Sequence, residues 1–146
     1  MKILGCSRAE AEKLIKDFFE GNPGLSALIE SLKAFYKKYK YIQAINGSRL
    51  MIRSDHVLLN SLIQASAAIL FKRWGCFIWD AIEAAGLDAK IIIAYHDEYQ
   101  LRVHQDSVDQ VRVLLASTLQ DVKEMYNVKV DLATDTKIGF NWRDTH

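Results

Sequence analysis

Apolar and polar residues follow a helical period near the start of the chain. In the segment 7–20, apolar side chains recur three and four positions apart, at Ala11, Leu14, Ile15, Phe18 and Phe19, which is the spacing of an amphipathic α-helix. Ser7 and Glu10 have the identities and the separation of a capping box, so Ser7 is expected to cap this helix. The run Gly21-Asn22-Pro23-Gly24 should end it, and a second helix is predicted over residues 25–40.

The pattern then changes to a period near two. The run YIQAINGSRLMIR is centred on Asn46-Gly47, a dipeptide that is typical of tight β-hairpin turns. Strands are therefore predicted at residues 41–45 and 48–53.

A long apolar helix is predicted next, over residues 55–85, with Gly86 as its C-terminal cap. A second hairpin, a helix and a short strand are predicted to follow, at 89–95 with 99–104, 106–126 and 129–135. This order predicts an α+β fold, in which an antiparallel sheet of two β-hairpins and a short strand packs with long helices. Because no linker or low-complexity tract interrupts the pattern, a single compact unit is expected.

Composition and charge narrow the class of protein. With 146 residues, 50% of them hydrophobic and 25% charged, the chain is neither disordered nor fibrous. A net charge of +1 excludes a uniformly basic nucleic-acid coat. Cys6 and Cys76 match no metal-ligand spacing and are too few for a disulfide framework, so a reduced, intracellular protein is expected. No apolar signal sequence follows Met1, and Lys72 and Arg73 break the longest apolar stretch, so neither secretion nor a membrane partner is expected.

Three ionisable residues, His96, Asp97 and Glu98, lie at the tip of the second hairpin. Side chains alternate along a strand, so the three cannot share one direction unless the turn twists them, and Asp97 should project furthest. Mg²⁺ binds through one or two carboxylates and takes its other ligands from water and substrate phosphates, so Asp97 could be half of such a site. Alternatively, these residues only suit a solvated turn.

A polar stripe lies on the predicted long helix. His56, Asn60 and Gln64 are spaced four residues apart and therefore share one face. Donors at this spacing suit the minor groove of a duplex, where every base pair offers acceptors, and they could contact it without reading sequence. The alternatives are a solvated stripe and an internal hydrogen-bond network.

Cations and aromatic rings gather between Ser31 and Ser54, where no acid is present. The cations are Lys33, Lys37, Lys38, Lys40, Arg49 and Arg53, and the rings are Phe35, Tyr36, Tyr39 and Tyr41. Such a patch could follow the phosphates of a nucleic acid, or the cations could simply stabilise a helix C-terminus. Together with the hairpin tip and the polar stripe, it fits the task of holding a duplex end beside a metal-bound phosphate.

Several segments resemble family A DNA polymerases, the group of bacterial DNA polymerase I and of phage replicative polymerases. YHDEYQLRV resembles motif C of this family, and RSDHVLLNSLIQASAAILFKRW resembles the helix that follows the fingers. Three further segments resemble family segments in the same order, so the resemblance covers essentially the whole chain: SRAEAEKLIKDFFEGNPGL, YIQAINGSRLMIRS and the tail IGFNWRDTH. By this resemblance, His146 is expected to be the natural C-terminus. His56 stands where bacterial members usually have Arg and phage members have His, which favours a phage-type enzyme.

The resemblance implies roles for individual residues. Asp97 would be the motif C metal carboxylate, Glu98 a supporting acid and His96 a contact to the primer end. The residues implied to bind primer–template DNA are Asn60 and Gln64 in the minor groove, His56 beside them, and Arg53, Lys72 and Arg73. The implied reaction is attack of the primer 3′-hydroxyl on the α-phosphate of an incoming dNTP at a two-metal Mg²⁺ site.

The resemblance also implies that parts of the enzyme must come from elsewhere. Residues 1–40 would adjoin the fingers and 41–146 would form the C-terminal palm part, but motif A, with the second metal aspartate, and the nucleotide-gripping fingers helix have no counterpart here. The chain is therefore expected to be inactive alone and to need a second polypeptide, as in a split polymerase acting in the cytoplasm, or the host cytoplasm if phage-encoded. A truncated polymerase and a non-catalytic DNA-binding or assembly module are the alternatives.

Overall fold

The computed structural model describes residues 7–145 and divides the chain into two compact units, Met1–Ala65 and Ser66–His146. They are called the N-terminal and the C-terminal unit below. The sequence predicted a single compact unit, with a helical part at 1–40 and a palm part at 41–146. The observed boundary falls inside a continuous helix whose apolar positions run through it, so neither composition nor periodicity marks it.

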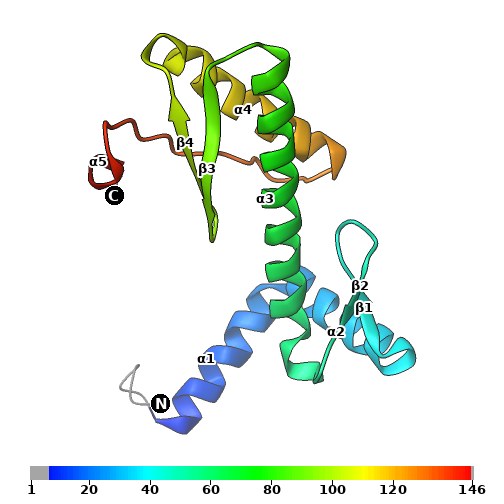
Figure 1. The fold of residues 1–146 in the computed structure, drawn as a ribbon. Coiled ribbons are helices and arrows are strands. Elements are labelled where there is room, and N and C mark those ends of the chain that lie inside the picture. The colour runs from blue at the N-terminus through cyan, green and yellow to red at the C-terminus, as the bar shows by residue number, and fades with distance from the viewer. Residues whose placement is uncertain (1–6, 146) are drawn as a thin grey trace. The chain divides into compact units, whose positions relative to one another are not determined.

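Two helices open the N-terminal unit (Figure 1): α1 (Arg8–Gly21) and α2 (Pro23–Tyr39). The predicted capping box of α1 is confirmed. The Glu10 amide donates to Ser7 Oγ at 3.3 Å, and the Ser7 amide donates to Glu10 Oε2 at 2.8 Å. The Ser7 hydroxyl also donates to Glu10 Oε2 at 2.7 Å. This bond and, to a lesser degree, the bond from the Ser7 amide hold the pKa of the Glu10 carboxyl below its usual value. Pro23 is the first residue of α2, where its missing N–H costs nothing, so the break between the helices is a single residue.

The strands of the first hairpin are shorter than the predicted 41–45 and 48–53. β1 (Tyr41–Gln43) and β2 (Arg49–Met51) pair antiparallel, with Ile42 opposite Leu50. The loop between them is wider than a two-residue Asn-Gly turn, because the Gly47 amide donates to the Ala44 carbonyl at 2.9 Å and Gly47 has a φ of 82°. Among residues 7–65, the buried side chains come from β1, the loop and the start of the next helix, and they are Ile42, Ala44 and Leu58.

The predicted helix over 55–85 is two elements. A 3₁₀ helix at Asp55–Val57 precedes α3 (Leu58–Ala84), which runs from the N-terminal into the C-terminal unit. Gly86 ends α3 as predicted. Its φ is 62°, its amide donates to the Glu83 carbonyl at 3.1 Å, and the Leu87 amide donates to the Ile82 carbonyl at 3.1 Å, the two bonds of a Schellman cap.

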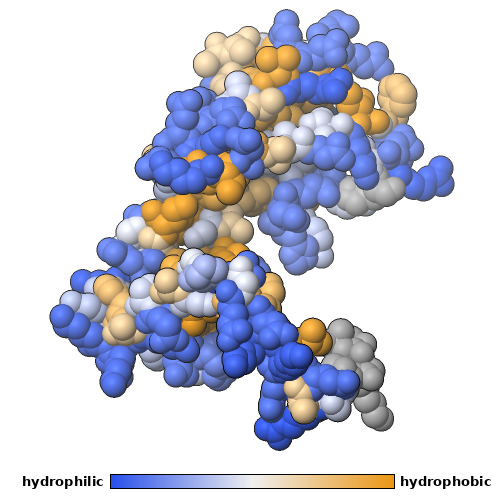
Figure 2. All heavy atoms as spheres, turned by 180° about the vertical axis from the view of Figure 1, so that it is seen from behind, coloured by the Kyte–Doolittle hydropathy of each residue, from blue (hydrophilic) through white to orange (hydrophobic). Residues whose placement is uncertain are grey.

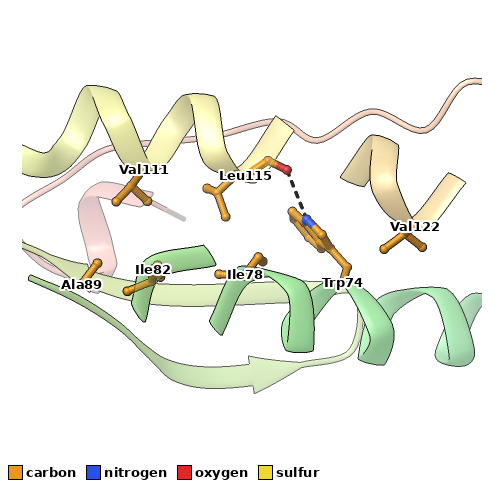
Figure 3. Packing of buried hydrophobic residues seen from close by; sticks show 7 residues of the cluster. All are labelled: Trp74, Ile78, Ile82, Ala89, Val111, Leu115 and Val122. Atoms are coloured by element: carbon orange, nitrogen blue, oxygen red, sulfur yellow. Dashed lines mark hydrogen bonds between the residues drawn. The ribbon is translucent and has the colours of Figure 1, made fainter. Parts of the chain in front are cut away.

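The core of the C-terminal unit lies between α3, α4 (Val108–Met125) and the second hairpin, β3 (Ala89–Tyr95) with β4 (Glu98–Val103). Figure 3 shows Val111 and Leu115 of α4 pointing toward the buried residues of α3. Trp74 also donates from Nε1 to the Leu115 carbonyl and to Thr118 Oγ1, at 3.2 Å each. A 3₁₀ helix at Gln105–Ser107 leads into α4.

A β-bulge interrupts the pairing of β3 and β4. Ile91 pairs with Leu101 and Ile93 with Gln100, which leaves Ile92 as an extra residue on β3. Side chains alternate along a strand, so the bulge changes which β3 residues share a face. Beyond it, Ala94 rather than Ile93 pairs with Tyr99.

The predicted strand over 129–135 is wrong. No described residue after β4 belongs to a strand, so the structure has two separate two-stranded antiparallel sheets within an α+β fold. Side chains of α4 hold this segment instead. Lys123 Nζ lies 2.5 Å from Asp131 Oδ1, and Gln120 Nε2 donates to the Leu132 carbonyl at 3.3 Å. A short helix, α5 (Trp142–Thr145), ends the described chain, and Cys6 and His146 lie outside it.

Large apolar side chains reach the surface of both units. Figure 2 shows apolar surface among polar residues on the face that it presents. The exposed large apolar residues of the two units include Phe18, Met51, Trp79, Ile92 and Phe140. Among residues 7–145, no helix combines the length and the apolar character that crossing a bilayer requires.

Candidate functional site

The tip of the second hairpin is a two-residue turn made of His96 and Asp97, because Tyr95 pairs directly with Glu98. His96 has a φ of 50°, in the left-handed region that tight hairpin turns require and that His tolerates better than most residues. The His96 and Tyr95 rings meet edge to face, 4.2 Å between centroids. Asp97 is exposed and pairs with no cation of the described residues. The turn therefore presents the Asp97 carboxylate to solvent.

Glu98 belongs to β4 and is held differently from Asp97. It is half-buried, and Gln100 Nε2 donates to its Oε1. Residues two apart on a strand point to the same face, so Gln100 can orient this carboxylate. Sequence reasoning did not identify Gln100, although its position two residues after Glu98 is the signal that could have found it.

Tyr99 lies on the opposite face of β4 and anchors the hairpin on α3. Its ring stacks on Phe71, with centroids 4.0 Å apart and planes 7° from parallel, and its hydroxyl donates to the Phe71 carbonyl at 3.0 Å. Burial and, to a lesser degree, Cys76 raise the pKa of Tyr99, although a hydrogen bond from the Gly75 backbone acts in the opposite direction. Tyr99 is thus a neutral donor over the whole physiological pH range.

The donor set at the tip fits half of a magnesium site. Asp97 offers an exposed carboxylate and Glu98 a second one beside it in the chain, which are the hard oxygen ligands that Mg²⁺ takes in ones and twos. Among the residues that the structure describes, no group of three or more His, Cys, Asp or Glu side chains is placed to hold a metal ion. Such a site would take its remaining ligands from water, substrate phosphates or further protein.

The polar stripe is only partly helical. Asn60 and Gln64 lie one turn apart on α3, whereas His56 lies in the 3₁₀ helix before it, so the three are not equally spaced along one α-helix. His56 Nε2 is 3.4 Å from Ser54 Oγ. Asn60 and Gln64 are exposed, and neither amide bonds to another described residue. The alternative of an internal network therefore has no support within residues 7–145.

Several cations and rings of the N-terminal unit form one connected cluster, the basic–aromatic patch, made of Phe35, Lys38, Tyr39, Tyr41 and Arg49. Lys40 Nζ lies 5.9 Å from the Tyr36 centroid as a separate pair. The Phe35 centroid lies 4.5 Å from that of Tyr39 and 5.5 Å from that of Tyr41. Lys38 Nζ lies 4.9 Å from the Tyr39 centroid, and Arg49 Cζ lies 4.9 Å from the Tyr41 centroid. A helix dipole can explain Lys38, in the last turn of α2, but not Arg49, which comes from β2.

The two adjacent cations of α3 have different surroundings. Lys72 is exposed and lines a shallow hollow together with Gly75 and Trp79. Arg73 is half-buried. Its guanidinium is hydrogen-bonded to the Tyr126 side chain, which raises its pKa, and lies 6.0 Å from the Phe77 centroid. Packing within the C-terminal unit is thus sufficient to explain Arg73, and the DNA contacts of Lys72, Arg73 and the exposed Arg53 remain predictions.

Comparison with known proteins supplies a family. The sequence model described as DNA polymerase family A matches residues 1–144. The chain is 25% identical to the DNA-directed DNA polymerase of Enterobacteria phage T3, over 99% of this chain and 24% of the phage protein. It is 27% identical to DNA polymerase I of Pseudomonas aeruginosa, over 99% of this chain and 17% of the bacterial protein. The phage and bacterial identities are similar, so the phage-type assignment stays a prediction.

A solved structure agrees in fold. The POL domain of Pol1 from M. smegmatis, in complex with DNA primer-template and dNTP, superimposes with a TM-score of 0.76 at 22% identity, over 83% of this chain and 24% of that chain. The chain thus spans about a quarter or less of these relatives. Because the family match extends over nearly all of its residues, the chain belongs to DNA polymerase family A.

Proposed function

We propose that this chain is the C-terminal palm part of a DNA-directed DNA polymerase and contributes the motif C aspartate, Asp97, to nucleotidyl transfer. One observation supports this most directly. The His-Asp-Glu triplet that resembles motif C lies at an exposed two-residue turn, where the Asp97 carboxylate is paired with no described cation. Its exposure leaves this carboxylate available to a metal ion and substrate phosphates from outside the described residues.

The residues at the tip have separate roles in this proposal. Asp97 binds a metal ion, and Glu98, oriented by Gln100, supports it from the adjacent strand position. His96 contacts the primer end. When bound, two Mg²⁺ ions would stabilise the attacking and leaving oxygens of the phosphoryl transfer.

DNA would be held by the N-terminal unit. The exposed amides of Asn60 and Gln64, free of partners among the described residues, can donate to the minor-groove acceptors present at every base pair. The basic–aromatic patch offers cations for phosphates and rings for apolar contact with the nucleic acid. Both contacts are independent of sequence, as a polymerase requires.

A second polypeptide with motif A and the fingers helix would complete the enzyme, and this chain would be inactive without it. The proposal is supported by the share of its relatives that the chain spans and by the resemblance, which leaves motif A and the fingers helix without a counterpart here. The exposed apolar side chains are compatible with further protein packing on both units.

The experiment is primer extension with Mg²⁺ by the tagged chain together with the polypeptides that it recovers from its native source. Asp97→Asn should lower nucleotide incorporation at least roughly 100-fold while leaving duplex binding nearly unchanged, because the amide cannot replace the metal-binding charge. Asp121→Asn is the matched control, since Asp121 is exposed on α4 and carries no ion pair within residues 7–145. Equal incorporation by both variants would contradict a catalytic Asp97.

A non-catalytic DNA-binding module is the second candidate. The exposed amides of Asn60 and Gln64 and the basic–aromatic patch favour it, because they could bind a duplex without any carboxylate pair. It predicts that Asp97→Asn changes neither incorporation nor duplex binding, whereas Gln64→Ala weakens binding. The same two assays therefore distinguish the candidates.

A further inference from the structure

Tyr99 is the anchor of the second hairpin that lies nearest to its tip. Of the hairpin residues that pack against the core of the C-terminal unit, Ile91, Leu101 and Val103 lie further from the turn, and Tyr99 is two residues from Asp97. On the other strand, the bulge at Ile92 separates Ile91 from the tip. The placement of the turn therefore depends mainly on Tyr99.

The Tyr99 ring is fixed on three sides. It stacks on Phe71 at 4.0 Å, meets Trp74 edge-on at 5.6 Å between centroids, and bonds through its hydroxyl to the Phe71 carbonyl at 3.0 Å. The accepting carbonyl belongs to the backbone of α3. The Tyr99 ring is thus held on α3 by two aromatic contacts and one hydrogen bond.

Gly75 makes room for this arrangement. A Cβ at position 75 would lie 2.3 Å from the Tyr99 hydroxyl oxygen and 2.7 Å from Cζ, where ordinary contacts are 3.4–4 Å. Gly75 does not have a positive φ, so its backbone conformation does not require glycine. The absence of a side chain at position 75 is instead what allows the tyrosine to rest against α3.

We infer that Tyr99, seated over Gly75 on α3, is a positioning residue that sets the location of the Asp97 carboxylate. The inference rests on the proposed function of Asp97. A strand rises about 3.3 Å per residue, so the turn begins within two short steps of the anchor. An alanine at position 75 would have to displace the ring by about 1 Å to reach ordinary contact, and displacements of this size at a reacting group lower rates by up to about 100-fold.

The test uses Gly75→Ala, Tyr99→Leu and the double variant in the reconstituted enzyme. Gly75→Ala should lower kcat roughly 10- to 100-fold with KM for dNTP and affinity for primer–template nearly unchanged. Tyr99→Leu removes the stacked ring and its hydroxyl bond, so it should lower kcat to a similar extent. The double variant should lose little more than either single variant, because both changes disable the same anchor. Gly24→Ala is the matched control, because a Cβ there meets no atom within 4 Å.

Hydrogen exchange on the chain alone gives a readout that needs no activity. Gly75→Ala should speed exchange at the amides of residues 96–98 more than at the amides of α4, whereas general destabilisation would speed both equally. If Gly75→Ala fails to fold, Tyr99→Phe replaces it. This variant removes only the hydroxyl and its bond to Phe71, and faster exchange at the tip alone is again expected.

The outcomes separate the inference from the proposed function. Activity lost in Asp97→Asn, together with full kcat and unchanged tip exchange in Gly75→Ala, would overturn the positioning role and leave the catalytic proposal standing. Activity retained in Asp97→Asn would overturn both. Losses of kcat that multiply in the double variant would also overturn the inference, because the two positions would then act independently.

Discussion

At the residue scale, Trp74 joins α3 to α4 through hydrogen bonds as well as packing. It is 8% exposed, and its indole N–H serves two acceptors of α4, the Leu115 carbonyl and Thr118 Oγ1. Thr118 is the buried polar residue of this region, and its hydroxyl also donates to the Leu114 carbonyl at 2.8 Å. The tryptophan thus contributes a donor as well as apolar area.

Replacing Trp74 with Phe should destabilise the C-terminal unit by about 1–3 kcal/mol, because a buried carbonyl and a hydroxyl lose their shared donor. Trp79→Phe is the matched control on the same helix. Trp79 is 49% exposed and makes no hydrogen bond to another described residue, so its replacement should cost about 0.5 kcal/mol or less. Urea unfolding followed by circular dichroism measures both, and equal losses would show that the indole hydrogen bonds contribute little.

Residues with near neighbours in the chain were predictable, and those with distant partners were not. Ser7 with Glu10 and Gly86 were identified correctly because caps depend on residues a few positions apart. Gly75 and Tyr99 are separated by the end of α3 and by β3, so no local pattern links them. The candidate residue Asp97 was placed at the tip from sequence, but the side chains that hold the tip came only from the structure.

At the element scale, helices were predicted well and the last strand was not. The segment 129–135 alternates apolar and polar residues as a strand does, but a strand exists only where another strand offers an edge. Here the segment contacts α4 through Lys123 and Gln120. Alternation alone could not distinguish a paired strand from an irregular segment held by α4. In the structure, the neighbouring residues Val130 and Asp131 are both exposed, so the alternation does not reflect a buried and a solvated face.

Lys123→Ala should loosen this segment without unfolding α4, because it removes the ion pair to Asp131. Amide hydrogen exchange should become faster over residues 128–133, whereas Lys137→Ala, at an exposed lysine without a described partner, should leave it unchanged. Lys123 holds the pKa of Asp131 below its usual value. Because the pKa of Asp131 is lower in the folded than in the unfolded chain, the ion pair stabilises the folded segment at pH values above the unfolded pKa of about 3.9.

The same contact should therefore be lost as the pH falls below about 4. Amide hydrogen exchange over residues 128–133, corrected for its intrinsic pH dependence, should become faster on acidification in the natural chain. In Lys123→Ala it should already be fast at neutral pH. A pH response that persists in Lys123→Ala would assign the acid sensitivity to another group. Since Asp131 is almost fully exposed, only a local effect is expected.

At the scale of the whole molecule, the sequence indicated the family and the fold class but not the division into units. The family match and the α+β fold agree with the expectations. No sequence feature marks the boundary between Ala65 and Ser66, because the helical pattern of α3 continues through it. The division separates Asn60, Gln64 and the basic–aromatic patch from the hairpin tip, so DNA binding and catalysis can be tested by variants in different units.

DNA binding by the whole chain should contain two contributions with different salt dependence. Cations that neutralise phosphates release counterions, so removing one should reduce the slope of log K against log salt by about 0.9. Arg49→Ala should show this effect, with Lys137→Ala as the control. Neutral amides release no counterions, so Gln64→Ala should weaken duplex binding by roughly 1–3 kcal/mol at every salt concentration and for every sequence.

Fluorescence anisotropy with a labelled primer–template, at salt concentrations of about 50 to 200 mM, separates the two contributions. An unchanged slope in Arg49→Ala would mean that the basic–aromatic patch does not contact phosphates, and that its cations only support the rings beside them. A loss in Gln64→Ala that varied with duplex sequence would contradict contact with minor-groove acceptors, because those acceptors are common to all base pairs. If Arg49→Ala lost affinity in a salt-dependent way and Gln64→Ala lost it equally at every salt concentration, both results would support a duplex bound by the N-terminal unit.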